Sequence, residues 1–183
     1  DFYVAKSKAA ERLGISGKIP SMPRNTEVEE ALSEYLRLFR ADSQPHELAG
    51  LRRRAVEAMR FFEDFRPRLV GRVLSGHATG SSRVNLHVFA DTPEQVVMHL
   101  VDRDIPHEAD ERRLRIRAGA WRTYPVFRFQ AGGATIDVTV FDPADLRQAP
   151  LSPVDGKPMK RATLAEVEAL LDEDPDAAEP LVG

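Results

Sequence analysis

Cysteine is absent from the 183 residues of this chain. Its absence excludes a disulfide framework, a thiolate zinc site and a cysteine nucleophile. It also fits the reducing environment of the cytoplasm, where we expect the protein to reside. No apolar run approaches the roughly 20 residues that a membrane-spanning helix needs, and the first residues lack a signal-peptide pattern. We therefore expect no membrane among its partners.

Basic side chains are absent from residues 163–183, which contain seven Asp or Glu. The whole chain has 26 basic and 29 acidic side chains, so this segment carries −7 and residues 1–162 carry +4. A mildly basic body with an acidic tail is a modest indication of anionic partners. The composition, with 42% hydrophobic and 30% charged residues, is typical of a globular protein.

Helical patterns occupy the first third of the chain. Residues 4–13 predict a short helix, and residues 15–25 predict a loop. Thr26 has Glu29 three residues later, which predicts a capping box at the start of a second helix. The apolar spacing of residues 45–65, with a proline in the first turn, predicts a third helix.

Strand patterns begin at residue 68. Residues 68–74 predict a first strand, residues 75–82 a loop of small side chains, and residues 83–89 a second strand with strict alternation. Residues 92–103 predict a helix with a capping threonine and a first-turn proline. Residues 110–118 then predict an exposed strand.

Two further alternating runs, residues 125–131 and 134–141, flank Gly132–Gly133 and predict a tight hairpin. A two-residue loop fixes the register and places Arg128 opposite Asp137. One side of the resulting sheet is apolar. The other side carries polar residues, namely Asn85, His87, Arg128, Gln130, Thr135, Asp137 and Thr139.

The order of these elements predicts an α+β fold whose mixed α/β sheet has one apolar and one polar face. We divide the chain into an N-terminal helical extension (1–44), a core (45–142), and a last part (143–183) with a proline-rich loop, a capped helix and the acidic tail. The proline-rich residues 146–159 predict either a lid over the polar face or a connector to the last helix.

Residues 69–88, LVGRVLSGHATGSSRVNLHV, resemble a motif of the nucleotidyltransferase fold of the DNA-polymerase-beta-like superfamily. In that family a strand ends in Gly-Ser, an Asp-x-Asp motif follows on the next strand, and a third Asp lies on a later strand. Gly71 matches the glycine and Asp137 matches the third Asp. The resemblance covers about residues 45–142 and implies a mixed sheet packed by helices.

Three positions depart from the family pattern. Arg72 stands at the serine of Gly-Ser, and Arg83 and Asn85 stand at the two aspartates of Asp-x-Asp. Asp137 is therefore the one candidate catalytic residue. The family's chemistry uses three carboxylates to hold two Mg²⁺ ions on a nucleoside triphosphate. Because this chain lacks that set of three carboxylates, we expect it to bind no cofactor. An active enzyme would need Mg²⁺ together with the nucleoside triphosphate.

Arginine and small residues at these positions point to a different use. Guanidinium groups bind phosphate without a metal, and a loop rich in glycine and serine can bring backbone N–H groups to an anion. The candidate ligand-binding residues are Gly71, Arg72, Ser81, Ser82, Arg83, Asn85, His87 and Arg128. A transition metal held by His87, Asn85 and Asp137 is the alternative use of the same face.

Three functions remain open at this point. The first is binding of a nucleotide or a phosphorylated small molecule without two-metal catalysis. The second is an active nucleotidyltransferase with a rearranged metal site. The third is a non-catalytic interaction module, with a protein or an RNA as its partner. The sequence gives no indication of the oligomeric state.

Overall fold

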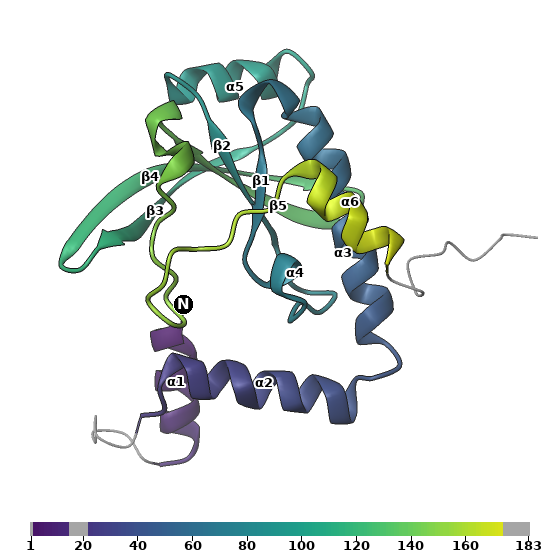
Figure 1. The fold of residues 1–183 in the computed structure, drawn as a ribbon, viewed down its shortest axis with the longest axis vertical. Helices are drawn as coiled ribbons and strands as arrows, with labels where there is room; N and C mark the ends of the chain where they lie inside the picture. Colours follow the sequence, from purple (N-terminus) through teal and green to yellow (C-terminus); the bar gives the residue numbers. More distant parts are fainter. Residues whose placement is uncertain (1, 15–21, 174–183) are drawn as a thin grey trace, which may run out of the picture.

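A five-stranded mixed sheet forms the centre of the computed structural model, which describes residues 2–14 and 22–173 (Figure 1). The strand order is β1-β2-β5-β4-β3, with β2 parallel to β5 and the other neighbours antiparallel. The predicted α+β class with a mixed sheet is confirmed. Part of the predicted loop at 15–25 and part of the acidic tail lie outside the described residues.

The strands differ greatly in length. Of the last three along the chain, each pairs antiparallel with the next, and two tight turns connect them. They are β1 (Arg68–Val70), β2 (Val84–Phe89), β3 (Glu108–Arg117), β4 (Ala120–Ala131) and β5 (Ala134–Phe141). The helices are α1 (Phe2–Arg12), α2 (Asn25–Phe39), α3 (Gln44–Phe61), α4 (Arg72–Ser75), α5 (Pro93–Val101) and α6 (Leu164–Asp172), with short 3-10 turns η2 (Glu63–Phe65) and η3 (Pro143–Arg147).

The turn between β4 and β5 fixes the register of the central strands. Gly132 and Gly133 have φ angles of +54° and +80°, which glycine adopts without the steric cost of a side chain. The predicted pairing of Arg128 with Asp137 is confirmed. The parallel neighbour β2 places Asn85 beside Asp137 as well, so these three side chains share one face of the sheet.

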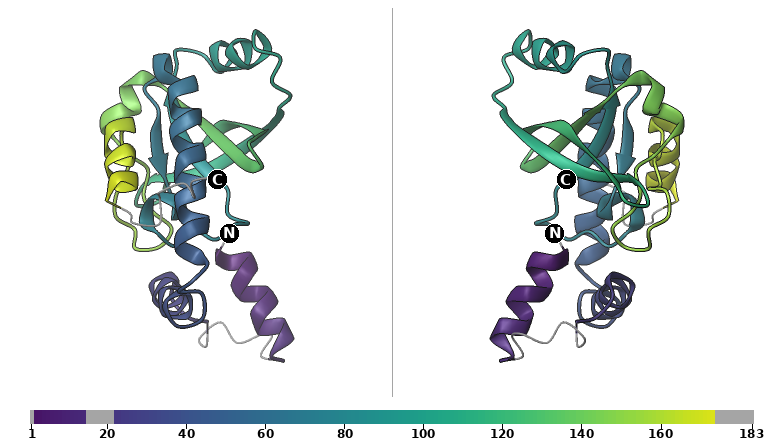
Figure 2. Two further views of the ribbon diagram at one scale, coloured as in Figure 1. Left: turned by 90° about the vertical axis from the view of Figure 1, so that its right-hand side faces the viewer. Right: turned by 90° about the vertical axis from the view of Figure 1, so that its left-hand side faces the viewer.

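The apolar face of the sheet packs against α3 and α5, as the alternation predicts (Figure 2). Val84, Leu86 and Val88 of β2 are fully buried there. The core is completed by Ile136, Val138, Val140, Phe127 and Phe129 from the sheet, and by Ala55, Met59, Phe62, Val96 and Leu100 from the two helices. The capping box predicted for α5, Thr92 with Gln95, is present.

The second face of the sheet, which the sequence predicts to be polar, is partly buried. His87, Asp137 and Thr139 are buried, and toward one end an aromatic cluster of Phe89, Tyr124 and Phe141 replaces the polar residues.

Residues 143–162 cover that end of the second face. The Leu151 N–H donates to the Arg115 carbonyl at the β3 edge (2.6 Å), and Ala162 pairs with Leu69 at the β1 edge. The segment therefore crosses the sheet, and it both connects β5 to α6 and covers part of the face.

Several predicted boundaries are wrong, and β4 begins at Ala120 and not at residue 125. The strand predicted over 68–74 ends at Val70, because Gly71 (φ +76°, ψ −153°) turns the chain into α4. The second helix begins at Asn25, one residue before the predicted cap, and the Arg24 N–H donates to Glu27 (2.6 Å). The helix predicted over 45–65 ends at Phe61, and a 3-10 turn follows it.

Helices α1 and α2 lie at one end of the molecule, beside the tip of the 143–162 segment (Figures 1 and 2). Glu29 of α2 contacts both Arg72 and His77 at 3.4 Å, which ties α2 to the α4 region. Apolar side chains of α2 remain exposed, namely Tyr35, Leu38 and Phe39. Within the part of the chain that the structure describes, no helix is long and apolar enough to cross a membrane.

Candidate anion-binding site

Asp137 lies at the centre of the candidate site, and its side chain is fully buried. Three guanidinium groups contact its carboxylate. Arg128 donates from Nε to Oδ1 (2.7 Å) and from Nη2 to Oδ2 (3.1 Å). Arg112 donates from Nη2 to Oδ2 (2.8 Å), and Arg83 from Nη1 to the same oxygen (3.4 Å). Both carboxylate oxygens are therefore occupied by arginine donors.

The sheet topology brings these arginines together from three elements. Arg128 is the direct cross-strand neighbour of Asp137. Arg112 lies two strands away on β3, paired with Tyr124, and its long side chain crosses β4 to reach Asp137. Arg83 immediately precedes β2, the parallel neighbour of β5.

The cluster carries a small net positive charge. Burial raises the pKa of Asp137, but the hydrogen bond from Arg128 and the charges of Arg112, Arg128 and Arg83 outweigh it, so the pKa lies below its usual 3.8. The carboxylate is ionised at neutral pH. Asp110 adds a second negative charge 3.3 Å from Arg128. Three cations and two anions leave the cluster with an excess of one positive charge.

Solvent reaches the guanidinium groups although it does not reach Asp137. The side chain of Arg83 is 52% exposed and that of Arg112 is 31% exposed. A guanidinium has five N–H donors, and Arg83 uses one of them on Asp137. The remaining donors are available to an anion that approaches from solvent, and such bonds are charge-assisted.

Asn85 links two of the arginines. Its Oδ1 accepts from Arg112 Nη1 (3.1 Å), and its Nδ2 donates to the Arg83 carbonyl (3.3 Å). Gly71 lies against this amide, since a Cβ added there would sit 3.6 Å from Asn85 Nδ2. Asn85 thus positions the arginines, and it uses its donor and its acceptor within the protein.

His87 is placed on the predicted face but is buried beneath the 143–162 segment. Its Nδ1 accepts from Arg161 Nε (3.1 Å), and its ring lies 4.4 Å from that of Phe141. Burial, and then the charges of Arg161 and Arg112, lower the pKa of His87 well below 6.5. His87 is a neutral acceptor for Arg161 and does not face a ligand approaching from solvent.

Three of the predicted ligand-binding residues are engaged away from Asp137. Arg72 contacts Glu29 and lies 5.9 Å from the centroid of the Phe2 ring. Ser82 Oγ accepts from the Thr79 N–H (3.0 Å), and Ser81 Oγ lies 3.3 Å from Thr79 Oγ1. These contacts give the three residues local partners in α2, α1 and the loop itself.

The loop between α4 and β2 is also bound to the protein. The Gly80 N–H donates to Glu47 Oε2 (2.7 Å), and Gln44 donates to the carbonyls of Gly76 and Ala78. A carboxylate of α3 therefore occupies a backbone donor that could otherwise meet a phosphate.

The side chains of this face do not fit the two-Mg²⁺ site of the family that the sequence resembles. A hard cation needs anionic oxygen, whereas both oxygens of Asp137 accept from arginine. Asn85 Oδ1 and His87 Nδ1 also accept from arginine. Among residues 2–14 and 22–173, no group of three or more His, Asp or Glu side chains could hold a metal.

Sequence reasoning missed Arg112 and Arg161. Arg112 belongs to a strand whose first half is charged on both faces, so alternation does not show which residues face Asp137. The register of β3 on β4 decides it. Arg161 lies in the irregular segment before α6, and its guanidinium lies 5.0 and 4.8 Å from the ring centroids of Phe89 and Phe141. No periodicity marks such a position.

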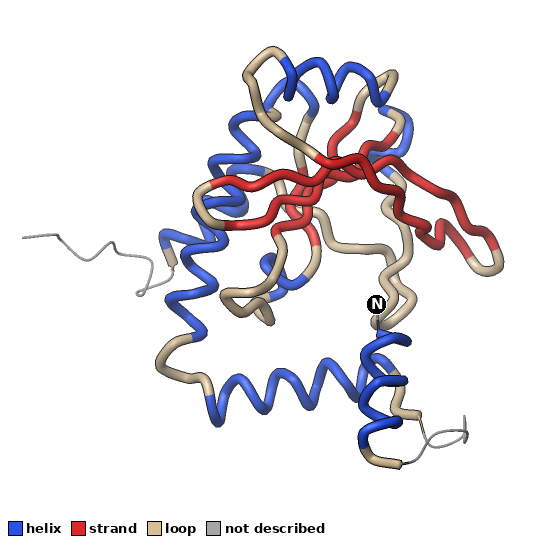
Figure 3. The backbone as a smooth tube through the Cα atoms, turned by 180° about the vertical axis from the view of Figure 1, so that it is seen from behind, coloured by secondary structure: helices blue, strands red, loops and turns tan. Residues whose placement is uncertain are grey.

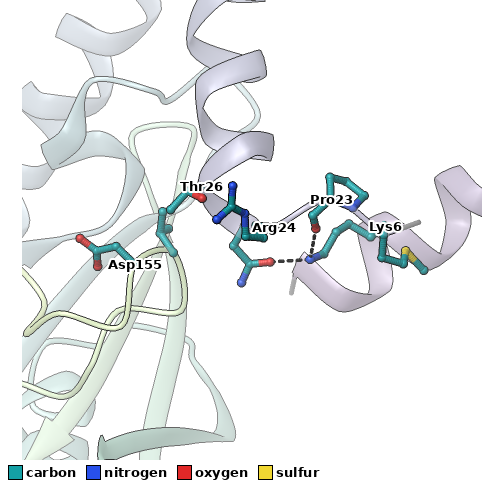
Figure 4. A pocket seen from close by; sticks show the side chains of 8 residues that line it. Lys6, Pro23, Arg24, Thr26 and Asp155 are labelled. Carbon is teal, nitrogen blue, oxygen red and sulfur yellow. Dashed lines mark hydrogen bonds between the residues drawn. The ribbon is translucent and has the colours of Figure 1, made fainter. Parts of the chain in front are cut away.

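Two hollows lie away from this site. One, of about 560 Å³, is lined by the start of α2, α1 and the 154–155 turn (Figure 4). There Lys6 donates to the Pro23 carbonyl (2.8 Å) and to Asn25 Oδ1 (2.6 Å), so the ammonium group serves the packing of α1 on α2. The other, of about 520 Å³, lies between α3 and the Gly132–Gly133 turn. Neither contains a residue of the Asp137 cluster.

Comparison with known proteins gives no relative: no family model, no curated protein and no solved structure matches this chain.

Proposed function

We propose that this chain is a nucleotidyltransferase-like protein that binds a nucleotide or a phosphorylated small molecule through arginine, without two-metal catalysis. The observation that carries the proposal is the enclosure of Asp137 by Arg83, Arg112 and Arg128. In the resembled family the corresponding region holds cations that bind phosphate. Here guanidinium groups supply the positive charge.

The geometry of the cluster suits an anion that arrives without a metal. Asp137 neutralises part of the charge and accepts hydrogen bonds from all three guanidinium groups, while the side chains of Arg83 and Arg112 remain partly exposed to solvent. A phosphate group can accept bidentate hydrogen bonds from such donors. A preformed arrangement lowers the entropy cost of ordering long side chains on binding.

A ligand panel tests the proposal. We expect nucleoside triphosphates, nucleoside monophosphates, a sugar phosphate or pyrophosphate to raise the melting temperature of the full chain in the presence of EDTA. Arg83→Gln should abolish or greatly reduce the shift, and Arg37→Gln, an exposed arginine of α2, should leave it unchanged. The reverse result, binding that needs Mg²⁺ and is lost in Asp137→Ala, would favour the active nucleotidyltransferase.

A second candidate, the interaction module, is favoured by the exposed apolar side chains of α2. Tyr35 and Phe39 lie 5.2 Å apart between ring centroids, and both are largely exposed, as is Leu38. Contiguous apolar surface of this kind is typical of contact sites. A flat response to the entire ligand panel would leave this candidate standing. For either function we propose a cytoplasmic location, in keeping with the absence of cysteine.

A further inference from the structure

The tip of the β3–β4 hairpin projects from the body of the molecule (Figures 1 and 3). We call residues 112–122, which form this tip, the ribbon. The ribbon contains five arginines and neither Asp nor Glu. The cationic residues are Arg112, Arg113, Arg115, Arg117 and Arg122. Positive charges this close together repel one another, and a polyanion that binds the segment would relieve this repulsion.

Two of the five arginines already have partners in the protein. Arg112 contacts Asp137, and Arg122 contacts Asp145 at 3.3 Å. Arg113, Arg115 and Arg117 form no ion pair with any residue that the structure describes, and Arg113 and Arg117 are exposed. Within the described part of the chain, three positive charges of the ribbon are therefore left without a counter-charge.

The strand register places two of these charges, on Arg113 and Arg115, beside the single tryptophan of the chain. Arg115 is the cross-strand partner of Trp121, and Arg113 is the partner of Thr123, so all four share one face of the β3–β4 hairpin. The guanidinium of Arg113 lies 5.3 Å from the centroid of the Trp121 ring. Trp121 is 53% exposed, although large aromatic residues are usually buried.

We propose that the ribbon binds single-stranded nucleic acid, with Arg113, Arg115 and Arg117 on the phosphates and a base stacked against Trp121. Arginine and an exposed aromatic side chain in alternation are the combination that single-strand binding proteins use. Trp121 favours single strands over a duplex, because an unpaired base has a free face to stack on whereas a paired base is already stacked. The shared chemistry covers DNA and RNA.

This inference does not rest on the function proposed for the Asp137 cluster. The ribbon charges that it uses, on Arg113, Arg115 and Arg117, make no contact with Asp137. Arg83→Gln, which weakens the cluster and leaves the ribbon intact, separates the two proposals.

The test uses the full chain and a short oligothymidylate or oligouridylate, with the fluorescence of Trp121 as the signal. Since this is the only tryptophan, quenching reports stacking at the ribbon itself. We expect saturable quenching at low salt. The logarithm of the binding constant should fall against the logarithm of salt concentration with a slope of about −2, because three phosphate contacts contribute roughly −0.7 each.

Variants assign the binding to the ribbon. Anisotropy of a labelled oligonucleotide should show at least about tenfold weaker binding for the triple variant R113Q/R115Q/R117Q, with a salt slope near zero. Trp121→Leu should weaken binding by roughly fivefold or more, and Trp121→Phe should restore most of it. Arg37→Gln and Arg83→Gln should bind within about twofold of the parent.

Four results would overturn the proposal. They are the absence of binding at low salt, unchanged binding by the triple variant, equal affinity for a duplex without quenching of Trp121, and equal competition by polyglutamate. The last result would assign the ribbon to acidic proteins. A difference between oligothymidylate and oligouridylate tells which nucleic acid the ribbon prefers, and either preference supports the proposal.

Discussion

Arg128 contacts both oxygens of Asp137, with Nε 2.7 Å from Oδ1 and Nη2 3.1 Å from Oδ2. The two residues face each other because the two-residue turn at Gly132–Gly133 sets the β4–β5 register. At the sheet position where the resembled family carries its third metal-binding carboxylate, this chain has an ion pair. The acidic side chain thus orients arginines, and the arginines are the groups open to a ligand.

Removal of the charge on Asp137 should destabilise the fold. Asp137→Asn leaves three guanidinium groups around a neutral amide, and breaking a buried ion pair from one side costs several kcal/mol. We expect the free energy of unfolding in urea to fall by roughly 2–4 kcal/mol. Asp42→Asn, at an exposed position between α2 and α3, is the control. Equal stability of the two variants would contradict the role given to Asp137.

His87 should make stability depend on pH between neutrality and mild acid. Burial, with the charges of Arg161 and Arg112, holds its pKa well below 6.5 in the folded state. Below pH about 6.5 the unfolded chain therefore binds a proton that the folded chain excludes. Stability then falls as pH decreases, by up to about 1.4 kcal/mol per pH unit, until the folded-state pKa is reached.

Urea unfolding of His87→Gln at several pH values tests this point. Between pH about 6.5 and 5, the free energy of unfolding of this variant should no longer contain the pH dependence that His87 contributes. His46→Gln, at an exposed position of α3, should keep the pH dependence of the parent. Asp137 acts in a separate window, since its pKa is lowered from 3.8 and its stabilising contribution is lost only as pH falls below about 4. Parallel slopes for His87→Gln and the parent would refute the assignment.

The two turn glycines should differ in their sensitivity to alanine. Both have positive φ, so each alanine costs about 1 kcal/mol of backbone strain. A Cβ at Gly132 would also collide with the guanidinium of Arg54, whereas that of Gly133 would meet open space. Moving Arg54 breaks its 2.8 Å contact with Glu57, a surface pair worth less than about 1 kcal/mol.

In thermal unfolding, Gly132→Ala should therefore be less stable than Gly133→Ala by up to about 1 kcal/mol. In an Arg54→Ala background the two alanine variants should become equally stable, because the colliding side chain is gone. A difference that persists there would mean that the turn itself, and not Arg54, discriminates between the two positions.

Arg72 and Arg83 should behave differently, although both stand where the nucleotidyltransferases that the sequence resembles carry other residues. Arg72 contacts the carboxylate of Glu29 on α2, at 3.4 Å, with half of its side chain exposed. Arg72→Ala should change the free energy of unfolding by less than about 1 kcal/mol and leave anion binding intact. Loss of phosphate binding in Arg72→Ala, measured by calorimetry, would place the ligand nearer to α4 than we propose.

Short-range chemistry made much of this fold predictable from the sequence. The Gly132–Gly133 turn determined the register of Arg128 and Asp137, and the capping residues of α5 and α6 are those that the sequence indicates. The end of β1 was not predictable from local pattern. Val73 has the apolar character of a strand residue and is buried, but it lies on α4 after the turn at Gly71.

The candidate site was predictable only in part, because two of its features depend on tertiary packing. Arg112 reaches Asp137 across an intervening strand, which no local spacing encodes. His87 has the position of a solvent-facing polar residue, yet Arg161 and the 143–162 segment bury it. The resemblance to nucleotidyltransferases pointed to Asp137 and Arg83, but it gave no indication of Arg112, which contacts the same carboxylate.

The central claim is that arginine, and not a metal ion, binds an anion at the Asp137 cluster. The most direct measurement is calorimetric titration of the full chain with ATP in EDTA and again in excess Mg²⁺. We predict binding in EDTA that Arg83→Gln weakens by about tenfold or more, since a charge-assisted contact is worth about 1.5–3 kcal/mol, and that Arg37→Gln leaves unchanged. Binding that appears only with Mg²⁺ and disappears in Asp137→Ala would contradict the claim.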